Sequence, residues 1–254
     1  MTPDSYGSLK ERVFTKDHQD VIHWTKFYYE RYQQASFIDS FTKRFPSNTF
    51  GKAVAVSSQW HRFSEFMPWL LCRCAANASS NIKRHYIIQG AYEELGMRDV
   101  NEIHADMFLG ACLASGLTKT DMAAQNNYDP VTMILNDKSD KVCNNYNDAR
   151  TLGVLLGLEI PAEEIVETLF SSLCHDASKQ ETLERTDFFT IHRQVESEHI
   201  RLAVSNFLRF CQADSEKKGF IQGFDESMQF WQDFWTAVGD LAAEIDTSDL
   251  AEAG

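Results

Sequence analysis

FFTIHRQVESEH, residues 188–199, contains two histidines and a glutamate at helical spacing. His192, Glu196 and His199 occupy positions i, i+4 and i+7, so at about 100° per residue their side chains fall within about 60° of arc. Imidazole and carboxylate groups on one inward face suit iron, zinc or manganese, and a set with more than one carboxylate favours non-haem iron. The alternative is a solvated helix face on which these residues stand by chance. Residues elsewhere in the chain decide between the two interpretations.

The composition of the chain limits the classes of ligand that it can take. Of the 254 residues 43% are hydrophobic, enough for a single all-helical domain over 1–254 with an enclosed cavity. The net charge is −13 and no basic run exceeds two residues, so we expect no nucleic acid and no membrane as a partner, and predict a small-molecule substrate. No apolar stretch has the length of a signal peptide core or a membrane span, so the expected location is cytoplasmic. The six cysteines lack a Cys-x2-Cys pair, which argues against a zinc knuckle or an iron–sulfur cluster.

Apolar residues recur at spacings of three and four along most of the chain, and no useful stretch alternates with period two. This pattern predicts an all-α fold with seven main helices. Pro46 ends the first helix, Gly96 closes the third as a C-cap, and Gly116 ends the fourth. Pro68 should kink the second helix or mark a local adjustment. The second predicted helix begins after Gly51 and includes residues 60–71. The other main helices are predicted at about 20–45, 82–95, 100–115, 144–172, 180–213 and 215–245, with a short helix at about 131–137. A polar N-terminal segment and an acidic C-terminal tail flank them.

Two further segments place polar residues inside apolar surroundings. Glu159 ends the helical run LGVLLGLE at 152–159, where an ionised carboxylate is costly unless it is paired or bound to metal; its alternative is a helix-end residue turned to water. His104 has apolar neighbours and is expected inside, as a ligand or as a hydrogen-bonded core histidine. Gly96 breaks the helix between Glu94 and His104, so these two residues can approach one metal from consecutive helices.

The order of these motifs resembles that of the haem-oxygenase-like di-iron oxidases and oxygenases. The shared order is Glu-Leu-Gly, an inward histidine about ten residues later, a glutamate that ends a Gly-Leu-Glu helix, and His-x3-(Asp/Glu)-x2-His. The resemblance covers roughly residues 20–240, includes an aromatic C-terminal helix, and implies a seven-helix haem-oxygenase-like bundle. It implies six metal ligands, which are Glu94, His104, Glu159, His192, Glu196 and His199.

The resemblance also implies an activity and its cofactors. We expect two Fe²⁺ ions, O₂ as co-substrate, and oxidation of a small amino-acid-like metabolite by N-oxygenation, desaturation or oxidative C–C cleavage. An external electron donor and a second copy of the chain, in a homodimer, are the further expected partners. Glu196 stands where many members have aspartate. Some members draw an additional carboxylate from the second helix, for which the nearest candidate is Glu65, with a surface position as its alternative.

The substrate cavity has a candidate wall in the aromatic stripe of Trp24, Phe27 and Tyr28 together with Asp148. Helix packing is the alternative for the stripe, and helix capping is the alternative for Asp148. This mixture of aromatic and polar residues favours a small amino acid or derivative over a long fatty acid. Two other classes remain open: a metal-free enzyme like the thiaminases or the pyrroloquinoline-quinone synthases, and a non-enzymatic interaction protein.

Overall fold

Helices make up the structure, a computed structural model that describes residues 18–125 and 127–252, with the side chains at 18, 19, 145, 194–199 and 248–252 left out. Within these residues the one β feature is an isolated antiparallel bridge between Leu95 and Ile103. The all-α prediction is therefore confirmed. No helix in the described part of the chain is both long and apolar enough to cross a membrane. The elements are α2 (His18–Ala35), α3 (Phe37–Arg44), α4 (Phe50–Asn77), α5 (Asn81–Glu94), η1 (Val100–Glu102), α6 (His104–Ala114), α7 (Lys119–Ala123), α8 (Asp129–Asn145), α9 (Asp148–Glu159), α10 (Ala162–Leu173), η2 (Ala177–Lys179), α11 (Gln180–Glu184), α12 (Asp187–Phe210) and α13 (Asp214–Glu252).

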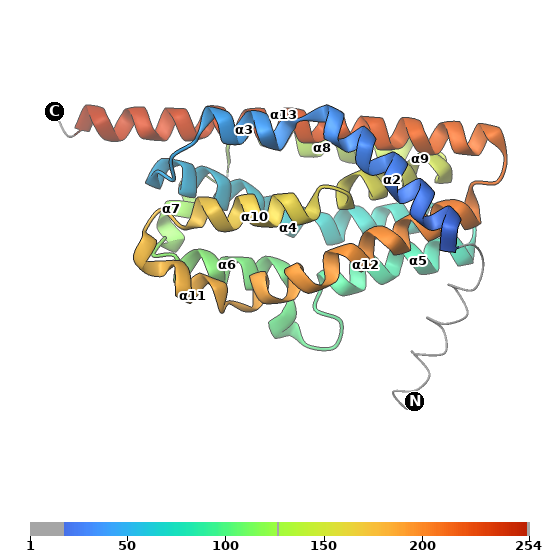
Figure 1. Ribbon diagram of the computed structural model, residues 1–254, viewed down its shortest axis with the longest axis horizontal. Helices are drawn as coiled ribbons and strands as arrows, with labels where there is room; N and C mark the ends of the chain where they lie inside the picture. The colour runs from blue at the N-terminus through green and yellow to red at the C-terminus, as the bar shows by residue number, and fades with distance from the viewer. Residues whose placement is uncertain (1–17, 126, 253–254) are drawn as a thin grey trace.

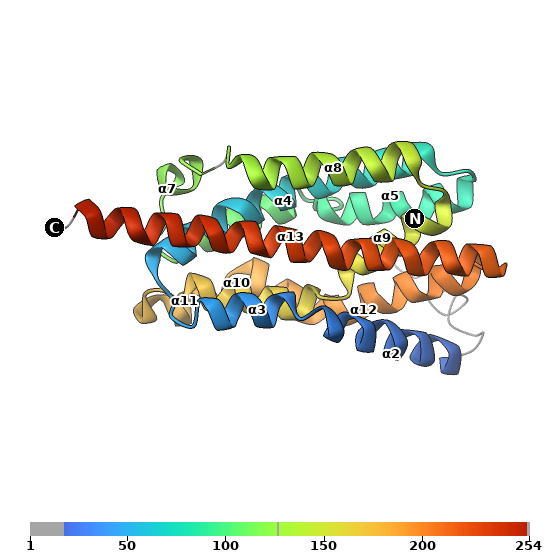
Figure 2. The same cartoon turned by 90° about the horizontal axis from the view of Figure 1, so that it is seen from above.

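The long helix α13 runs the length of the bundle, as Figures 1 and 2 show. Helices α9 and α4 pack on it, and α3, α8 and α2 lie along its flanks. On the other side of α9, helix α12 packs against α9, α10, α6 and α2, while α5 and α6 pack on α4. Helices α5, α6 and α12 therefore lie farther from α13 than α4 and α9 do (Figure 1).

Gly153 allows α9 to lie directly on α13. A Cβ atom at this position would lie 2.0 Å from the backbone oxygen of Phe220, far inside van der Waals contact. Trp231 of α13 donates a hydrogen bond from Nε1 to the backbone oxygen of Gly157, at 3.0 Å. This close contact fixes the rotation of α9 and, with it, the position of Glu159 at the end of the helix.

An aromatic cluster fills the space between α13 and α4. Trp231 and Phe234 of α13 are almost fully buried. The ring of Trp231 stacks on that of Trp60 with 5.9 Å between centroids, and lies 5.0 Å from the ring of Phe63. Buried aromatic pairs contribute about 0.5–1.5 kcal/mol beyond the burial of their area, so this cluster stabilises the packing of α4 against α13.

Three predicted helices are each divided in two, which is why seven is too few. The first is broken between α2 and α3 at Ser36, whose backbone is left-handed with a φ of 52°. The sixth predicted segment divides into α11 and α12 before Thr186. The segment through Glu159 divides into α9 and α10 at Pro161, which has no backbone N–H to continue a helix. Hydrophobic periodicity persists across all three breaks because both halves of each pair cover the same core, so the pattern concealed the breaks.

Capping residues explain most of the remaining helix ends. The helix predicted to begin at Asn144 begins later, because Asn144 belongs to α8, which is longer than the short helix expected there. Asn147 instead caps α9 by accepting a hydrogen bond from the Arg150 backbone N–H at 3.0 Å. Thr49 and Ser80 cap α4 and α5 in the same way. Pro68 lies within α4, which continues as one helix on both sides of it.

Candidate metal centre

Four of the six predicted ligands converge on one cavity between α5, α6, α9 and α12. Glu94 is the last residue of α5, His104 the first of α6, and Glu159 the last of α9, while His192 lies in the second turn of α12. All four line a cavity of about 70 Å³. Because each residue comes from a different helix, their convergence depends on the packing of the whole bundle.

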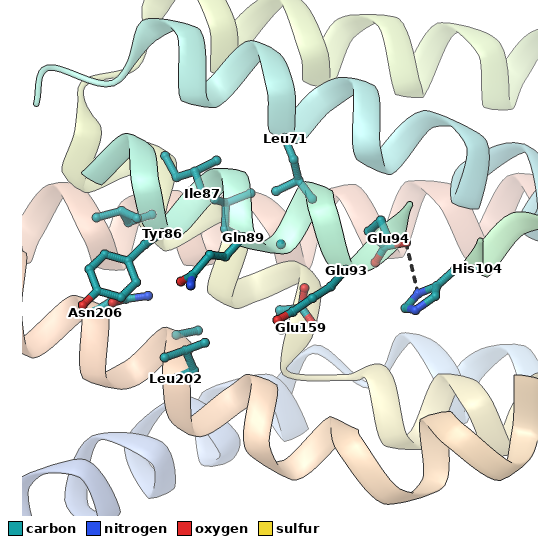
Figure 3. Close-up of a pocket in the computed structure, with 14 residues that line it drawn as sticks. Leu71, Tyr86, Ile87, Gln89, Glu93, Glu94, His104, Glu159, Leu202 and Asn206 are labelled. Carbon is teal, nitrogen blue, oxygen red and sulfur yellow. Dashed lines mark ion pairs between the residues drawn. The ribbon is translucent and has the colours of Figure 1, made fainter. Parts of the chain in front are cut away.

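The turn between α5 and α6 brings Glu94 to His104. Gly96 has a φ of 76°, in the left-handed region, and a Cβ atom there would lie 2.3 Å from the backbone oxygen of Asp99. Both observations require glycine, so the prediction that Gly96 closes this helix is confirmed. Across the turn, Glu94 Oε2 lies 3.3 Å from His104 Nδ1, the contact drawn as a dashed line in Figure 3.

His192 is buried beside His104, and the backbone already orients its ring. The centroids of the two imidazoles are 4.7 Å apart, and their planes meet at 66°. Nδ1 of His192 lies 2.7 Å from the backbone oxygen of Phe188, and because a carbonyl oxygen only accepts, this nitrogen carries the hydrogen. Nε2 is then the nitrogen whose lone pair can bind a metal ion, an arrangement common among metal-binding histidines.

Acidic residues surround His104. Burial lowers the pKa of an imidazole, but the hydrogen bond to Glu94 and the charges of Glu94, Glu159 and Glu93 act in the opposite direction and raise the pKa of His104 overall. Carboxylates that share a partly buried cavity repel one another unless a cation lies among them. The four converging residues offer carboxylates and imidazoles, the kinds of group to which iron binds in proteins.

A second cavity, of about 100 Å³, adjoins the same residues. It shares Glu94, His104 and Glu159 with the first cavity and adds Glu93. Figure 3 shows Glu93 and Glu159 at the end nearer His104, and Tyr86 at the far end. The rest of its wall is apolar or neutral, with Leu71, Ile87, Gln89, Gly90, Leu152, Leu155, Leu202, Ala203 and Asn206. No lysine or arginine is among these described lining residues.

Two residues of the site were missed by reasoning from the sequence. Trp60 was assigned only to the apolar face of its helix, yet it lines the first cavity, and its buried Nε1 has no hydrogen-bond acceptor among the described residues. An indole N–H in this position can donate to a bound ligand. Glu93 lines the second cavity, and the only signal for it was its place next to Glu94.

The other two predicted ligands, Glu196 and His199, belong to α12, but their side chains lie outside the described residues. Helix α12 runs from Asp187 to Phe210, so the helix predicted for 188–199 is confirmed. Among the side chains that are described, no three His, Cys, Asp or Glu form a group that could hold a metal ion. The six-ligand set therefore stays a prediction.

Glu65 lies on the outer face of α4. Its side chain is 62% exposed, and its Oε2 is 3.8 Å from Nδ1 of His61 on the same helix. It lines neither of the two cavities at the candidate centre. The surface alternative given for Glu65 therefore describes its position.

The structure places the predicted cavity wall elsewhere. Trp24 packs on Phe207 with 4.8 Å between ring centroids, and Phe27 and Tyr28 belong to the same aromatic core between α2, α12 and α13. None of the three lines either cavity at the candidate centre. Helical spacing showed that these residues share a face, but the neighbour that covers the face is decided by the tertiary fold.

Asp148 is likewise a structural residue at the start of α9. Its Oδ2 lies 2.7 Å from Lys83 Nζ, and its Oδ1 accepts a hydrogen bond from the Ser79 backbone N–H at 3.1 Å. Burial raises the pKa of this carboxyl group, but the hydrogen bonds from Lys83 and Ser79 lower it by more than burial raises it. The pKa of Asp148 is therefore lowered overall. Asp148 ties α9 to the α4–α5 connection and is not part of the wall of either cavity.

Comparison with known families identifies the class of protein. A family model described as "iron-containing redox enzyme" matches residues 56–232, which include Glu94, His104, Glu159 and His192. The match covers well over half of the chain, and the chain therefore belongs to this haem-oxygenase-like family of iron-containing redox enzymes. No curated protein matches the chain significantly.

Proposed function

We propose that this oxidoreductase is a non-haem di-iron enzyme that uses O₂ to oxidise a small amino-acid-like metabolite. The observation that carries the proposal is the convergence of Glu94, His104, Glu159 and His192, from four helices, on one cavity inside a chain of this family. Glu196 and His199, one and two turns after His192, complete the proposed ligand set. Two ferrous ions held there would supply the binding and reduction of O₂.

The protein residues orient the donors and exclude water. The Phe188 carbonyl holds the His192 ring with Nε2 as the ligating atom. The short turn at Gly96 holds Glu94 against His104 before any metal binds. The other residues of the first cavity, among them Phe63 and Val166, are mostly apolar and keep bulk water away from the reacting groups.

The cavities favour a substrate with an apolar portion. Leu71, Leu152 and Leu202 line the second cavity, and neutral Gln89 and Asn206 supply its amide groups. With no lysine or arginine among the described lining residues, a substrate carboxylate or amine would be placed toward the metal ligands and its apolar side chain along these leucines. A small amino acid derivative with an apolar side chain meets this description, and Trp60, a lining residue whose Nε1 has no acceptor among the described residues, would donate a hydrogen bond to it.

Iron content tests the proposal most directly. The full chain, purified without chelators, loaded anaerobically with Fe²⁺ and freed of excess metal, should retain about two irons per chain if six ligands serve two sites. Oxygen uptake by the loaded protein should then rise above the rate of free Fe²⁺ when an apolar amino acid derivative is added. A chain that retains no iron after loading would refute the proposal and favour the metal-free or interaction-protein alternatives.

A further inference from the structure

A separate polar pocket lies on the other side of the bundle, between α8 and α13 at the start of α9. Its volume is about 410 Å³, larger than either cavity at the candidate metal centre. Three cationic side chains line it, Lys138 and Lys141 from α8 and Arg150 from α9. Glu226 and Phe230 of α13 face them. None of these residues lines the cavities at Glu94 and His104, so the pocket is independent of the metal centre.

Lys138 differs from the other cations of the pocket because no ion pair holds it within the described residues. Arg150 binds the carboxylate of Glu226 through two nitrogens, and Lys141 Nζ lies 2.7 Å from Asp137 Oδ2. The Lys138 side chain is only 4% exposed, and its Nζ donates a single hydrogen bond, at 3.0 Å, to the backbone oxygen of Glu226. An ammonium group carries three donors, so this environment satisfies a neutral amine better than a charged one.

Lys52 shows what a purely structural buried lysine looks like in the same chain. It is 3% exposed, but its Nζ donates to both the Phe45 backbone oxygen and Asn48 Oδ1. Both lysines also lie near an aromatic ring, so hydrogen bonds and the pocket are what distinguish them. It lines none of the three cavities described above. Lys138 instead combines burial, few partners and a pocket large enough for a small molecule.

The electrostatics agree with this geometry. Burial lowers the pKa of Lys138 to about 7; the charges of Glu226 and Asp137 oppose the shift, and those of Lys141 and Arg150 add to it. About half of the Lys138 side chains are then neutral at pH 7, whereas an ordinary lysine with a pKa of about 10.4 is neutral in about one molecule in 2,500. Two further titratable side chains, Asp233 of α13 and Tyr146 at the end of α8, also line the pocket.

We propose that Lys138 is an imine-forming lysine and that this pocket binds small aldehydes or 2-oxo acids that carry a carboxylate. The neutral Nζ attacks the carbonyl carbon, and the carbonyl oxygen takes up a proton to give a carbinolamine. Loss of water then forms the C=N bond, so that amine and carbonyl compound give imine and water with no oxidant or reductant. Arg150 stays paired with Glu226, but Lys141 is 54% exposed and its ion pair with Asp137 is screened by water, so a ligand carboxylate can replace this weak partner. The Phe230 ring, whose centroid is 5.5 Å from Lys138 Nζ, forms an apolar wall.

Reductive trapping tests the proposal on the whole chain without iron. Glyoxylate and cyanoborohydride should convert Lys138 to its carboxymethyl derivative at pH 7 much faster than Lys141, by at least about 100-fold, because an ordinary lysine amine is almost entirely protonated at this pH. Peptide mapping locates the modification and separates it from the N-terminal amine, whose pKa is also low. The rate at Lys138 should reach half its maximum near pH 7. Equal labelling of the two lysines, or an unlabelled Lys138, overturns the proposal.

Two variants test the ligand class and the role of Lys138. Lys141→Gln should slow glyoxylate trapping at Lys138 several-fold and leave trapping of uncharged propanal unchanged, because only glyoxylate has a carboxylate to lose its partner. An equal effect on both aldehydes, or on neither, contradicts the assignment of a carboxylate-bearing ligand. Lys138→Met should abolish the adduct in this peptide, and an adduct that persists there on another side chain would refute the role of Lys138. The peptide mapping of the unaltered chain decides the proposal even if this variant does not fold. Because the chain is tested without iron, neither outcome depends on the proposed oxidase activity.

Discussion

Glu94 Oε2 and His104 Nδ1 lie 3.3 Å apart although they belong to different helices. The residues between them form a left-handed turn at Gly96 and a short 3-10 helix, η1, and these return the chain to the same side of the bundle. A carboxylate and an imidazole are thus held together by local backbone geometry, while Glu159 and His192 are brought to them by packing between helices. The site therefore combines one local pair with two distant residues.

Gly96→Ala should damage both stability and the site. The alanine would have a positive φ, and its Cβ would lie 2.3 Å from Asp99 O, so we expect the free energy of unfolding to fall by about 1–3 kcal/mol or more. Iron retention should fall with it because Glu94 and His104 move apart. Gly110→Ala, in α6 with nothing within 4 Å of the added Cβ, is the matched control and should gain up to about 1 kcal/mol. Urea unfolding compares the two; equal stabilities would show that the turn tolerates a side chain.

His192→Ala should lower bound iron by at least half without unfolding the chain. The substitution removes a proposed ligand and a hydrogen bond worth about 0.5–1.5 kcal/mol, while the backbone of α12 remains packed. Glu65→Gln, on the exposed face of α4, is the control and should keep the iron content of the unaltered protein. Wild-type iron in His192→Ala would reject the assignment.

His199 and Glu198, two of the α12 residues whose side chains are not described, carry a matching prediction from the sequence. His199→Ala should lose iron as His192→Ala does, because both imidazoles are placed on one helix face. Glu198→Gln, on another side of the same helix, should retain it. Loss of iron in Glu198→Gln would show that the register of the helix is misassigned.

Trp60→Phe should change substrate binding more than it changes the fold. Phenylalanine keeps an aromatic ring against Trp231 but removes the buried N–H, which has no acceptor among the described residues, from a side chain that lines the first cavity. We expect iron content to be retained and KM to rise by about 2- to 12-fold, the equivalent of one hydrogen bond of about 0.5–1.5 kcal/mol. Trp235→Phe removes another buried indole N–H that has no acceptor within the described part of the chain. Trp235 does not line the metal-site cavities, so this variant should leave KM unchanged. A similar rise in both variants would assign the effect to packing.

Asp148→Asn should produce a pH-dependent loss of stability. Hydrogen bonds from Lys83 and Ser79 lower the pKa of Asp148 in the folded state despite its burial, so its contribution is present above the unfolded pKa of about 4 and disappears as the pH falls through the lower folded value. Near neutral pH the variant should lose about 1–3 kcal/mol, because Lys83 loses its charged partner. The difference from the unaltered protein should shrink below about pH 4.

Asp137→Asn supplies the control for this pH dependence. Asp137 also pairs with a lysine, Lys141, but its side chain is 61% exposed, so its ion pair is screened by water. We expect a loss of less than about 1 kcal/mol at neutral pH. Urea unfolding from pH 3 to pH 7 measures both variants, and a constant difference for Asp148→Asn across this range would contradict the charged role of Asp148.

The sequence by itself determined the all-α class, the helix through 188–199 and the glycine that ends α5. These are local properties: apolar residues at helical spacing define a buried face, and a left-handed residue at a helix end favours glycine. The order of Glu94, His104, Glu159 and His192 along the chain also helped to indicate the family, and the match to the family model then confirmed it.

Only the tertiary structure decided what each buried face contacts. Periodicity placed Tyr28 on an apolar stripe, but α12 and α13 cover that stripe and make it core. The sequence left Asp148 open as a cavity-wall residue or a helix cap, and the structure pairs it with Lys83 from another helix. Lys138 gave no signal in the sequence because its burial, and hence its lowered pKa, arises from helices that are distant in the chain. Burial, pairing and pKa depend on neighbours in space, and the packing of helices such as α9 against α13 at Gly153 is what places those neighbours.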